Sequence, residues 1–204
     1  MKTLRLVLWG LVALVALGVA WVAVDRFGTS ERRAQAVGTI AAFGGPFEAV
    51  MASAGDPEPR RVTWDDWKGR PHVVFFGFTH CPEICPTTLY EMGQWLEAMG
   101  PAADDLDVYF VTVDPARDTP AYMADYLRAF DPRIKAVTGT EAQIADLVKA
   151  WRVTAEKVPL GDGEYNMNHT TTVFLMGADG TLRNALNYGE EQEDAVAKLK
   201  RLVS

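Results

Sequence analysis

Continuous apolar runs alternate with amphipathic segments along the chain from about Gly44 onward. Three of these runs are rich in β-branched and aromatic residues and predict strands at His72–Phe78, Asp107–Val113 and Thr171–Met176. The runs are continuous rather than alternating with polar positions. We therefore expect strands that are covered on both faces, as in a parallel α/β sheet.

Segments with helical spacing lie between and after these strands. The first three cover Ile84–Met99, Ala121–Phe130 and Glu141–Ala150. A turn at Gly177–Gly180 then leads to a last strand, Leu182–Leu186, and to a final segment, Glu191–Leu202. Apolar residues in this final segment recur at spacings of three and four, which predicts a helix with one buried face.

The order of these elements predicts the fold class. Strand, helix, strand, helix, hairpin and helix indicate an α/β fold with a parallel centre and one antiparallel edge pair. This is the thioredoxin-like order, with a central mixed sheet and flanking helices, and a segment near Pro132–Val158 lengthens its middle. The 204 residues and 49% hydrophobic content suffice for one domain with a real core.

An apolar run from Leu6 to Val24 precedes this domain. As a helix, its about 19 residues span about 28 Å, which is enough to cross a bilayer. Trp21 and other bulky residues stand where a cleavable signal peptide has small ones, so we expect an uncleaved transmembrane helix. Lys2 and Arg5 before the run predict a cytoplasmic N-terminus, with the remainder on the periplasmic side of the inner membrane.

We therefore expect three parts: a membrane anchor at residues 1–25, a polar linker at 26–43 and a thioredoxin-like domain at 44–204. The formal net charge of −7 excludes nucleic acid as a partner, because phosphate binding requires a basic surface. Metal ions and basic proteins remain open as partners.

The only two cysteines, Cys81 and Cys85, lie in "FTHCPEICPTT" with three residues between them. They follow a predicted strand and reach the first turn of a predicted helix, where the positive helix end and free amides stabilise thiolates. Pro82 and Pro86 restrict the loop, so we expect a preset distance between two reactive sulfurs. A structural disulfide or two buried thiols is the alternative reading, although structural bridges usually close longer loops.

A third ligand would have to come from one of three histidines. Two thiolates with one neutral nitrogen form a trigonal site that accepts either copper oxidation state. His72 opens a strand, and we expect it at the surface; His80 adjoins Cys81, but we expect its side chain to point away. His169, in "NMNHTTTVFL", stands at the start of a strand, and in thioredoxin-like sheets the loop before this strand faces the thiol helix, so His169 is the candidate ligand.

At these residues the sequence resembles the Sco/SenC family of membrane-anchored, thioredoxin-like proteins that handle copper for cytochrome c oxidase assembly. The matching stretches are "FFGFTHCPEICPTTL", "VTVDPARDTP" and the histidine of "NMNHTTTVFL". The resemblance implies copper, Cu(I) or Cu(II), as the bound metal and Cys81, Cys85 and His169 as its ligands.

The same resemblance places Asp114 near the site as a supporting acidic residue. The alternative is that "VTVDPARDTP" has no part in metal binding and only starts a helix. Asp118 or Thr119 would then be the N-cap, and Pro120 would lie in the first turn. The family usually has an aspartate before the histidine, and this chain has Asn168. An amide can still orient the imidazole by a hydrogen bond, but it brings no charge to raise its basicity.

Two functions fit these residues. The first is a metallochaperone that delivers copper to the copper-bearing subunit of cytochrome c oxidase, with a second copper chaperone or a thiol reductant as further partners. The alternative is a thiol:disulfide oxidoreductase that reduces the cysteines of the oxidase copper site, with Cys81 as the attacking and Cys85 as the resolving thiol. The wide cysteine spacing and a histidine in place of the usual cis-proline favour the first.

Overall fold

The computed structural model describes residues 43–54 and 56–204. The predicted anchor at residues 1–25 and nearly all of the predicted linker lie outside these residues. Within the described ranges, no helix combines the length and the apolar character needed to cross a membrane. Phe43–Ser204 form one compact unit, which carries every candidate site residue.

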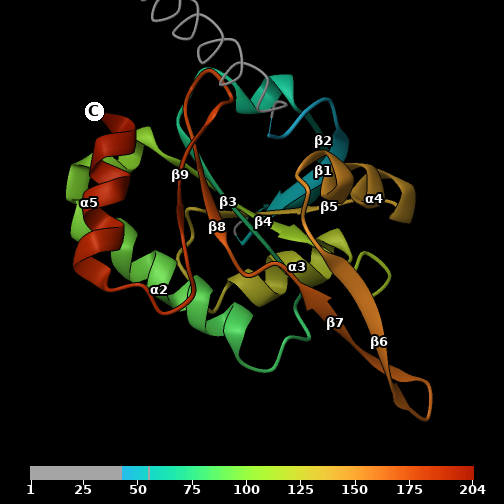
Figure 1. The fold of residues 1–204 in the computed structure, drawn as a ribbon. Coiled ribbons are helices and arrows are strands. Elements are labelled where there is room, and N and C mark those ends of the chain that lie inside the picture. Colours follow the sequence, from blue (N-terminus) through green and yellow to red (C-terminus); the bar gives the residue numbers. More distant parts are fainter. Residues whose placement is uncertain (1–42, 55) are drawn as a thin grey trace, which may run out of the picture. The chain divides into compact units, whose positions relative to one another are not determined.

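A mixed sheet of seven strands forms the centre of this unit (Figure 1). Its order is β2-β1-β5-β4-β3-β8-β9. The middle strands β3 (His72–Gly77), β4 (Asp107–Thr112) and β5 (Ile134–Thr138) are parallel. The edges are antiparallel: β2 (Asp56–Thr63) with β1 (Glu48–Ser53), and β9 (Leu182–Leu186) with β8 (Val173–Met176). The predicted α/β class with a central mixed sheet is confirmed.

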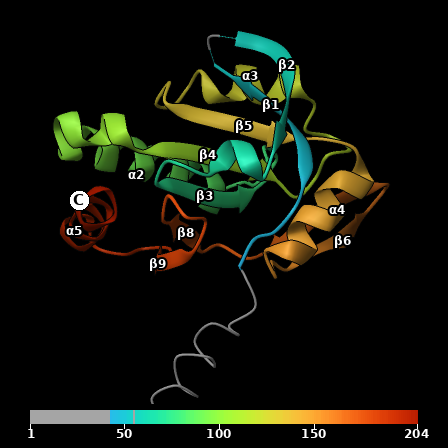
Figure 2. The ribbon, with the colours of Figure 1, turned by 90° about the horizontal axis from the view of Figure 1, so that it is seen from above.

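Helices cover both faces of the sheet, as the continuous apolar strands required. In Figure 2, α2 (Ile84–Met99) and α5 (Gln192–Val203) lie on one side of it and α4 (Glu141–Ala150) on the other. Every residue of β3 is buried. Alternate side chains of this strand serve the two layers: Phe75 stacks on Phe110, and Phe76 contacts Trp151 at the end of α4.

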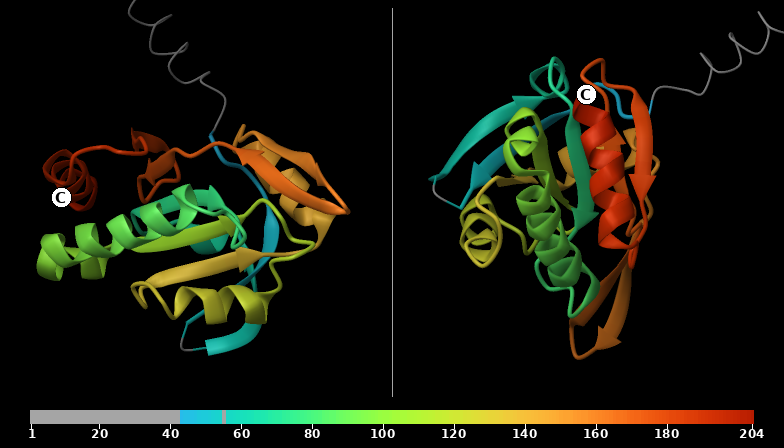
Figure 3. Two further views of the ribbon diagram at one scale, coloured as in Figure 1. Left: turned by 90° about the horizontal axis from the view of Figure 1, so that it is seen from below. Right: turned by 90° about the vertical axis from the view of Figure 1, so that its left-hand side faces the viewer.

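The segment near Pro132–Val158, which was expected to lengthen the middle of the fold, forms regular secondary structure. After α3 (Pro120–Leu127) the chain forms β5 and α4 and then leaves the sheet as a separate hairpin of β6 (Ala155–Gly161) and β7 (Glu164–His169). Figure 3 shows this hairpin projecting from the body of the domain. The hydrophobic pattern of the sequence did not predict this hairpin, because most of its residues are polar or exposed.

The expectation that His72 lies at the surface is wrong. Its side chain is fully buried, and its ring contacts those of Trp67 and Tyr109. Trp67 belongs to a short 3-10 helix, η1 (Asp65–Trp67), that folds over this end of the sheet. A second such helix, η2 (Gly100–Asp105), follows α2. Pairing with β4 and β8 and cover from η1 exclude water from the imidazole, and this burial lowers its pKa below 6.5.

Replacing His72 with glutamine should reduce the sensitivity of folding to acid. The folded state disfavours the imidazolium, so the unfolded state binds more protons below pH 6.5. The stability that the neutral imidazole contributes is therefore present above this pH and is lost as the pH falls below 6.5. Urea unfolding at several pH values should show a shallower loss for His72→Gln. Parallel losses in the two proteins would contradict a buried, neutral His72.

Candidate metal centre

The two cysteines lie in the connection from β3 to α2 and in the first turn of α2. Cys81 is in the connecting loop, with its amide donating to the Phe78 carbonyl at 3.2 Å, and Cys85 is the second residue of α2. Glu83 precedes the helix without a side-chain cap, so the first amides of the helix are free to bind other acceptors. The amide of Cys85 donates to the sulfur of Cys81 at 3.4 Å. The predicted placement at a helix start is thus observed.

The two sulfurs differ in burial and in acidity. Both are free thiols, with Cys81 partly exposed and Cys85 fully buried. A hydrogen bond from the Cys85 thiol, the largest cause, together with backbone amides, lowers the pKa of Cys81 to about 4. The same interaction and its burial raise the pKa of Cys85. Cys81 therefore carries the thiolate at neutral pH, and Cys85 carries the proton until a metal replaces it.

Gly77, at the end of β3, makes room for the buried sulfur. A Cβ atom at this position would lie 2.7 Å from the sulfur of Cys85 and 2.8 Å from the ring of Phe110. Any side chain here would therefore displace the sulfur of Cys85 or the ring of Phe110. Gly77 was not among the predicted site residues, although its place in "FFGF", directly before the thiol loop, was a usable signal.

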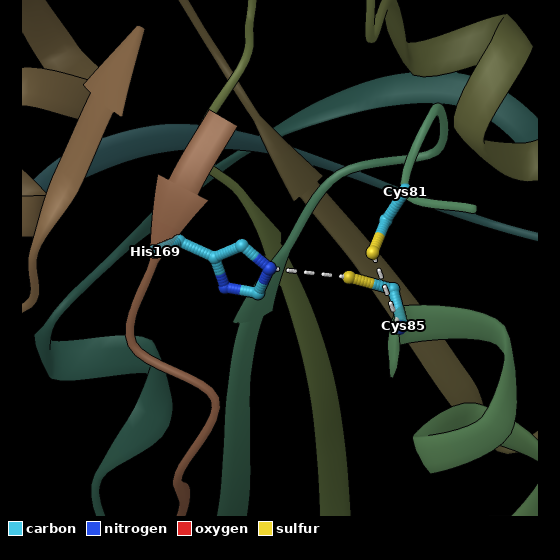
Figure 4. A group of neighbouring side chains, drawn as sticks. All are labelled: Cys81, Cys85 and His169. Carbon is cyan, nitrogen blue, oxygen red and sulfur yellow. Dashed lines mark hydrogen bonds between the residues drawn. The ribbon is translucent and has the colours of Figure 1, made fainter. Parts of the chain in front are cut away.

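His169 is the last residue of β7 and points at the thiols (Figure 4). Its Nε2 lies 3.5 Å from the sulfur of Cys85. Its Nδ1 donates to the backbone carbonyl of Thr170 at 2.9 Å. A donating Nδ1–H leaves the lone pair on Nε2, on the side that faces the sulfurs. The ring of Phe78 meets the imidazole edge to face, with centroids 5.6 Å apart.

These three side chains fit a metal ion. Their ligand atoms lie within 4.8 Å of one another, and they form the only such group of three found in the described part of the chain. Ligands about 2.0–2.3 Å from one ion stand about 3.5–4 Å apart in a trigonal arrangement. Small side-chain movements would therefore close the site. Two soft sulfurs with one imidazole are a donor set suited to copper or zinc.

Asp114 is not part of the ligand group, and its side chain bonds to residues other than the two cysteines. Its carboxylate is buried and receives hydrogen bonds from Arg117 and from the hydroxyl of Tyr165, the latter at 2.8 Å. Tyr165 belongs to β7, four residues before His169. Asp114 thus connects the loop after β4 to the strand that carries the histidine. Arg117 and Tyr165 were not among the predicted site residues, because their roles depend on where the hairpin packs.

Asn168 does not support the imidazole. Its side chain is exposed, and neighbouring residues of a strand point to opposite faces, so it faces away from His169. The carbonyl of Thr170 takes the orienting role that the sequence assigned to Asn168. His80 also stays apart from the metal-ligand group, as expected: its ring stacks on Tyr122 with centroids 5.7 Å apart.

Asp118 supports the thiol side of the site. It is fully buried, and the amide of Thr79 and the hydroxyl of Thr112 donate to its carboxylate at 3.2 and 2.6 Å. Burial raises its pKa, and these hydrogen bonds oppose the rise. Thr79 lies two residues before Cys81, so this network fixes the cysteine loop. Of the two caps considered for α3, Thr119 is the observed one, accepting from the amide of Tyr122.

Comparison with known proteins gives the same picture. The SCO1/SenC family model matches residues 36–204. Protein sco1 of Schizosaccharomyces pombe is 34% identical over 160 residues, which are 76% of this chain and 60% of that protein. This chain therefore spans less than two thirds of the length of that relative.

Solved structures extend the match to three dimensions. ScoI of Bradyrhizobium japonicum, solved with copper bound, is 43% identical, with a TM-score of 0.71 over 79% of this chain and 99% of the other. BsSco, described as a member of the Sco family of cytochrome c oxidase assembly proteins with a disulfide switch, shares the fold at 22% identity. Its TM-score is 0.60 over 80% of this chain and 95% of the other. The thioredoxin-like fold is thereby confirmed, and the chain belongs to the SCO1/SenC family.

Proposed function

We propose that this protein binds one copper ion through Cys81, Cys85 and His169 and delivers it to the copper centre of cytochrome c oxidase during assembly. The observation that carries the proposal is the convergence of these three ligand atoms within 4.8 Å. Copper in the related ScoI structure and the assembly role stated for BsSco support the choice of metal and target.

The site combines features that suit temporary binding. Two thiolates hold Cu(I), and the imidazole completes a set that also accepts Cu(II). Cys81 and His169 are partly exposed, whereas Cys85 is buried. An acceptor protein can therefore replace the outer two ligands first, while Cys85 keeps the ion until the exchange is complete. Binding releases the proton of Cys85, because only a thiolate is a ligand.

We also propose that residues 1–25 anchor the domain on the periplasmic side of the inner membrane. An oxidising compartment would convert the two thiols to a disulfide, which has no thiolate to offer a metal. The chain then needs a thiol reductant as a partner, besides a copper donor and the copper-bearing oxidase subunit.

A thiol:disulfide oxidoreductase is the second candidate function. The observation in its favour is the division between the two sulfurs: a partly exposed Cys81 with its pKa lowered to about 4, and a buried, protonated Cys85. Such a pair matches an attacking and a resolving thiol. His169 has no necessary part in that reaction, so it separates the two functions.

Replacing His169 with alanine should damage copper binding selectively. Removing the hydrogen-bond partner of a metal ligand typically weakens metal binding about 10- to 100-fold. Removing the ligand itself should weaken Cu(II) binding by more than this. Chelator competition on the reduced protein should show about one copper per wild-type chain. Reduction of a small disulfide by the same variant should stay near the wild-type rate.

His80→Ala is the matched control, because its imidazole adjoins Cys81 in sequence but stacks on Tyr122. It should keep both properties. If His169→Ala lost copper binding and disulfide reduction to the same extent, the enzymatic function would be favoured instead.

Cys81 should react as a thiolate well below neutral pH. Since its pKa is lowered from 9.0 to about 4, its alkylation by iodoacetamide should be nearly independent of pH between 5.5 and 8. An ordinary thiol would gain about tenfold per pH unit over this range. Mass spectrometry of partly alkylated protein distinguishes Cys81 from the buried Cys85. A rate for Cys81 that climbs with pH like that of a free thiol would contradict the lowered pKa.

A further inference from the structure

The β6–β7 hairpin presents one face to the body of the domain. Alternate residues of a strand share a face, so Tyr165, Met167 and His169 point the same way. Across the hairpin, Ala155 pairs with His169 and Lys157 with Met167. The ligand histidine therefore stands at one end of a row of side chains, and whatever holds this row sets the approach of His169 to the sulfurs.

Apolar packing holds this face only in part. A cavity of about 510 Å³ lies beside it, bounded by the hairpin, the loop after β4 and helix α4. Met167 and Tyr165 line it on one side, and Ile144 and Val148 of α4 on the other. A cavity of this size reduces the apolar contact between the hairpin and the body of the domain. Polar contacts near the row therefore contribute a larger share of the energy that holds the hairpin in place.

Tyr165 makes the polar contact between the hairpin and the body. Its hydroxyl donates to Asp114 at 2.8 Å, and Nη1 of Arg117 donates to its backbone carbonyl at 3.1 Å. The guanidinium of Arg117 also lies 3.7 Å from the centre of the Tyr165 ring and forms an ion pair with Asp114. We call these three residues the clasp. Asp114 and Arg117 both belong to the turn after β4, which is part of the body.

The same turn holds the thiol side through a second set of side-chain hydrogen bonds. Asp118 binds Thr79 and Thr112, and none of the hydrogen bonds of Asp118 reaches the hairpin within the described residues. The two sets of bonds meet at Thr112, whose hydroxyl donates to Asp118 and accepts from the backbone amide of Asp114. They therefore share the backbone of the turn, whereas the Tyr165 hydroxyl bonds only to the Asp114 side chain. Loosening the clasp leaves the Asp118 network, and with it the two sulfurs, in place.

We propose that Tyr165 and Arg117 are positioning residues whose clasp on Asp114 holds His169 against the two sulfurs. This inference rests on the proposed function, in which His169 is a copper ligand. Cu(II) needs the imidazole, whereas Cu(I) is held by two thiolates alone. The clasp therefore controls affinity for one oxidation state and leaves the other unchanged.

A double-mutant cycle in the reduced full-length protein tests the clasp. It uses the wild type, Tyr165→Phe, His169→Ala and the double variant, and measures Cu(II) and Cu(I) affinity by chelator competition. Tyr165→Phe removes only the hydroxyl and should weaken Cu(II) binding about tenfold, the size of one hydrogen bond to a carboxylate, with Cu(I) binding unchanged. In the His169→Ala background the same substitution should have no effect, because a positioning residue acts only through the ligand it positions.

Two further measurements separate positioning from general destabilisation. Electron paramagnetic resonance of Cu(II)-loaded Tyr165→Phe should show a reduced nitrogen contribution, and Arg117→Lys should show the same trend, since lysine lacks the planar fork. Tyr188→Phe is the matched control: its phenol is 44% exposed, and no hydrogen bond to its hydroxyl is found in the described part of the chain. It should match the wild type in both affinities.

A rival attachment defines the result that would overturn the proposal. The neck of the hairpin is closed by hydrogen bonds between Thr154 and Thr170, directly beside His169. If the neck alone positions the imidazole, Tyr165→Phe and Arg117→Lys bind Cu(II) as the wild type does. An equal loss in the presence and absence of His169 also overturns it. If His169→Ala bound Cu(II) as tightly as the wild type, the proposed ligand set itself would be refuted.

Discussion

The structure depends on one long-range approach, that of the Nε2 atom of His169 to the sulfur of Cys85 at 3.5 Å across 84 residues of sequence. Neither the thiol pair nor the histidine forms the three-ligand site alone. Two sulfurs at a helix start make a redox pair, and a lone imidazole makes no site. The parallel β3–β4 pairing, the antiparallel β3–β8 pairing and the hairpin before β8 together bring the two segments to the same end of the sheet. The fold thus converts a thiol pair into a three-ligand site.

The turn that follows β4 is the common support of both halves. Asp118 and Thr79 fix the cysteine loop, and Asp114 with Tyr165 fixes the histidine strand. Both carboxylates are buried, and their hydrogen bonds offset part of the cost of removing charge from water. Because this support lies in the turn after β4 and not in the ligand residues themselves, Cys81 and His169 stay partly exposed, which suits the proposed transfer of a metal.

Features that depend on local chemistry could be predicted from the sequence. The strands flanking the site, the thiols at the start of α2 and a cap at Asp118 or Thr119 follow from apolar runs, proline placement and capping rules, and the structure selects Thr119. Features that depend on which distant segment covers a position could not. His72 looked like a surface residue until η1 was seen to fold over it, and Asn168 looked like a partner of the imidazole until its strand face was known.

X-ray absorption at the copper edge, on the reduced full-length protein loaded with one equivalent of copper, tests the central claim most directly. The account predicts that oxidised copper is surrounded by two sulfur atoms and one imidazole nitrogen, and that the nitrogen disappears in His169→Ala. Copper surrounded only by nitrogen and oxygen, or by sulfur alone in the oxidised state, would contradict it.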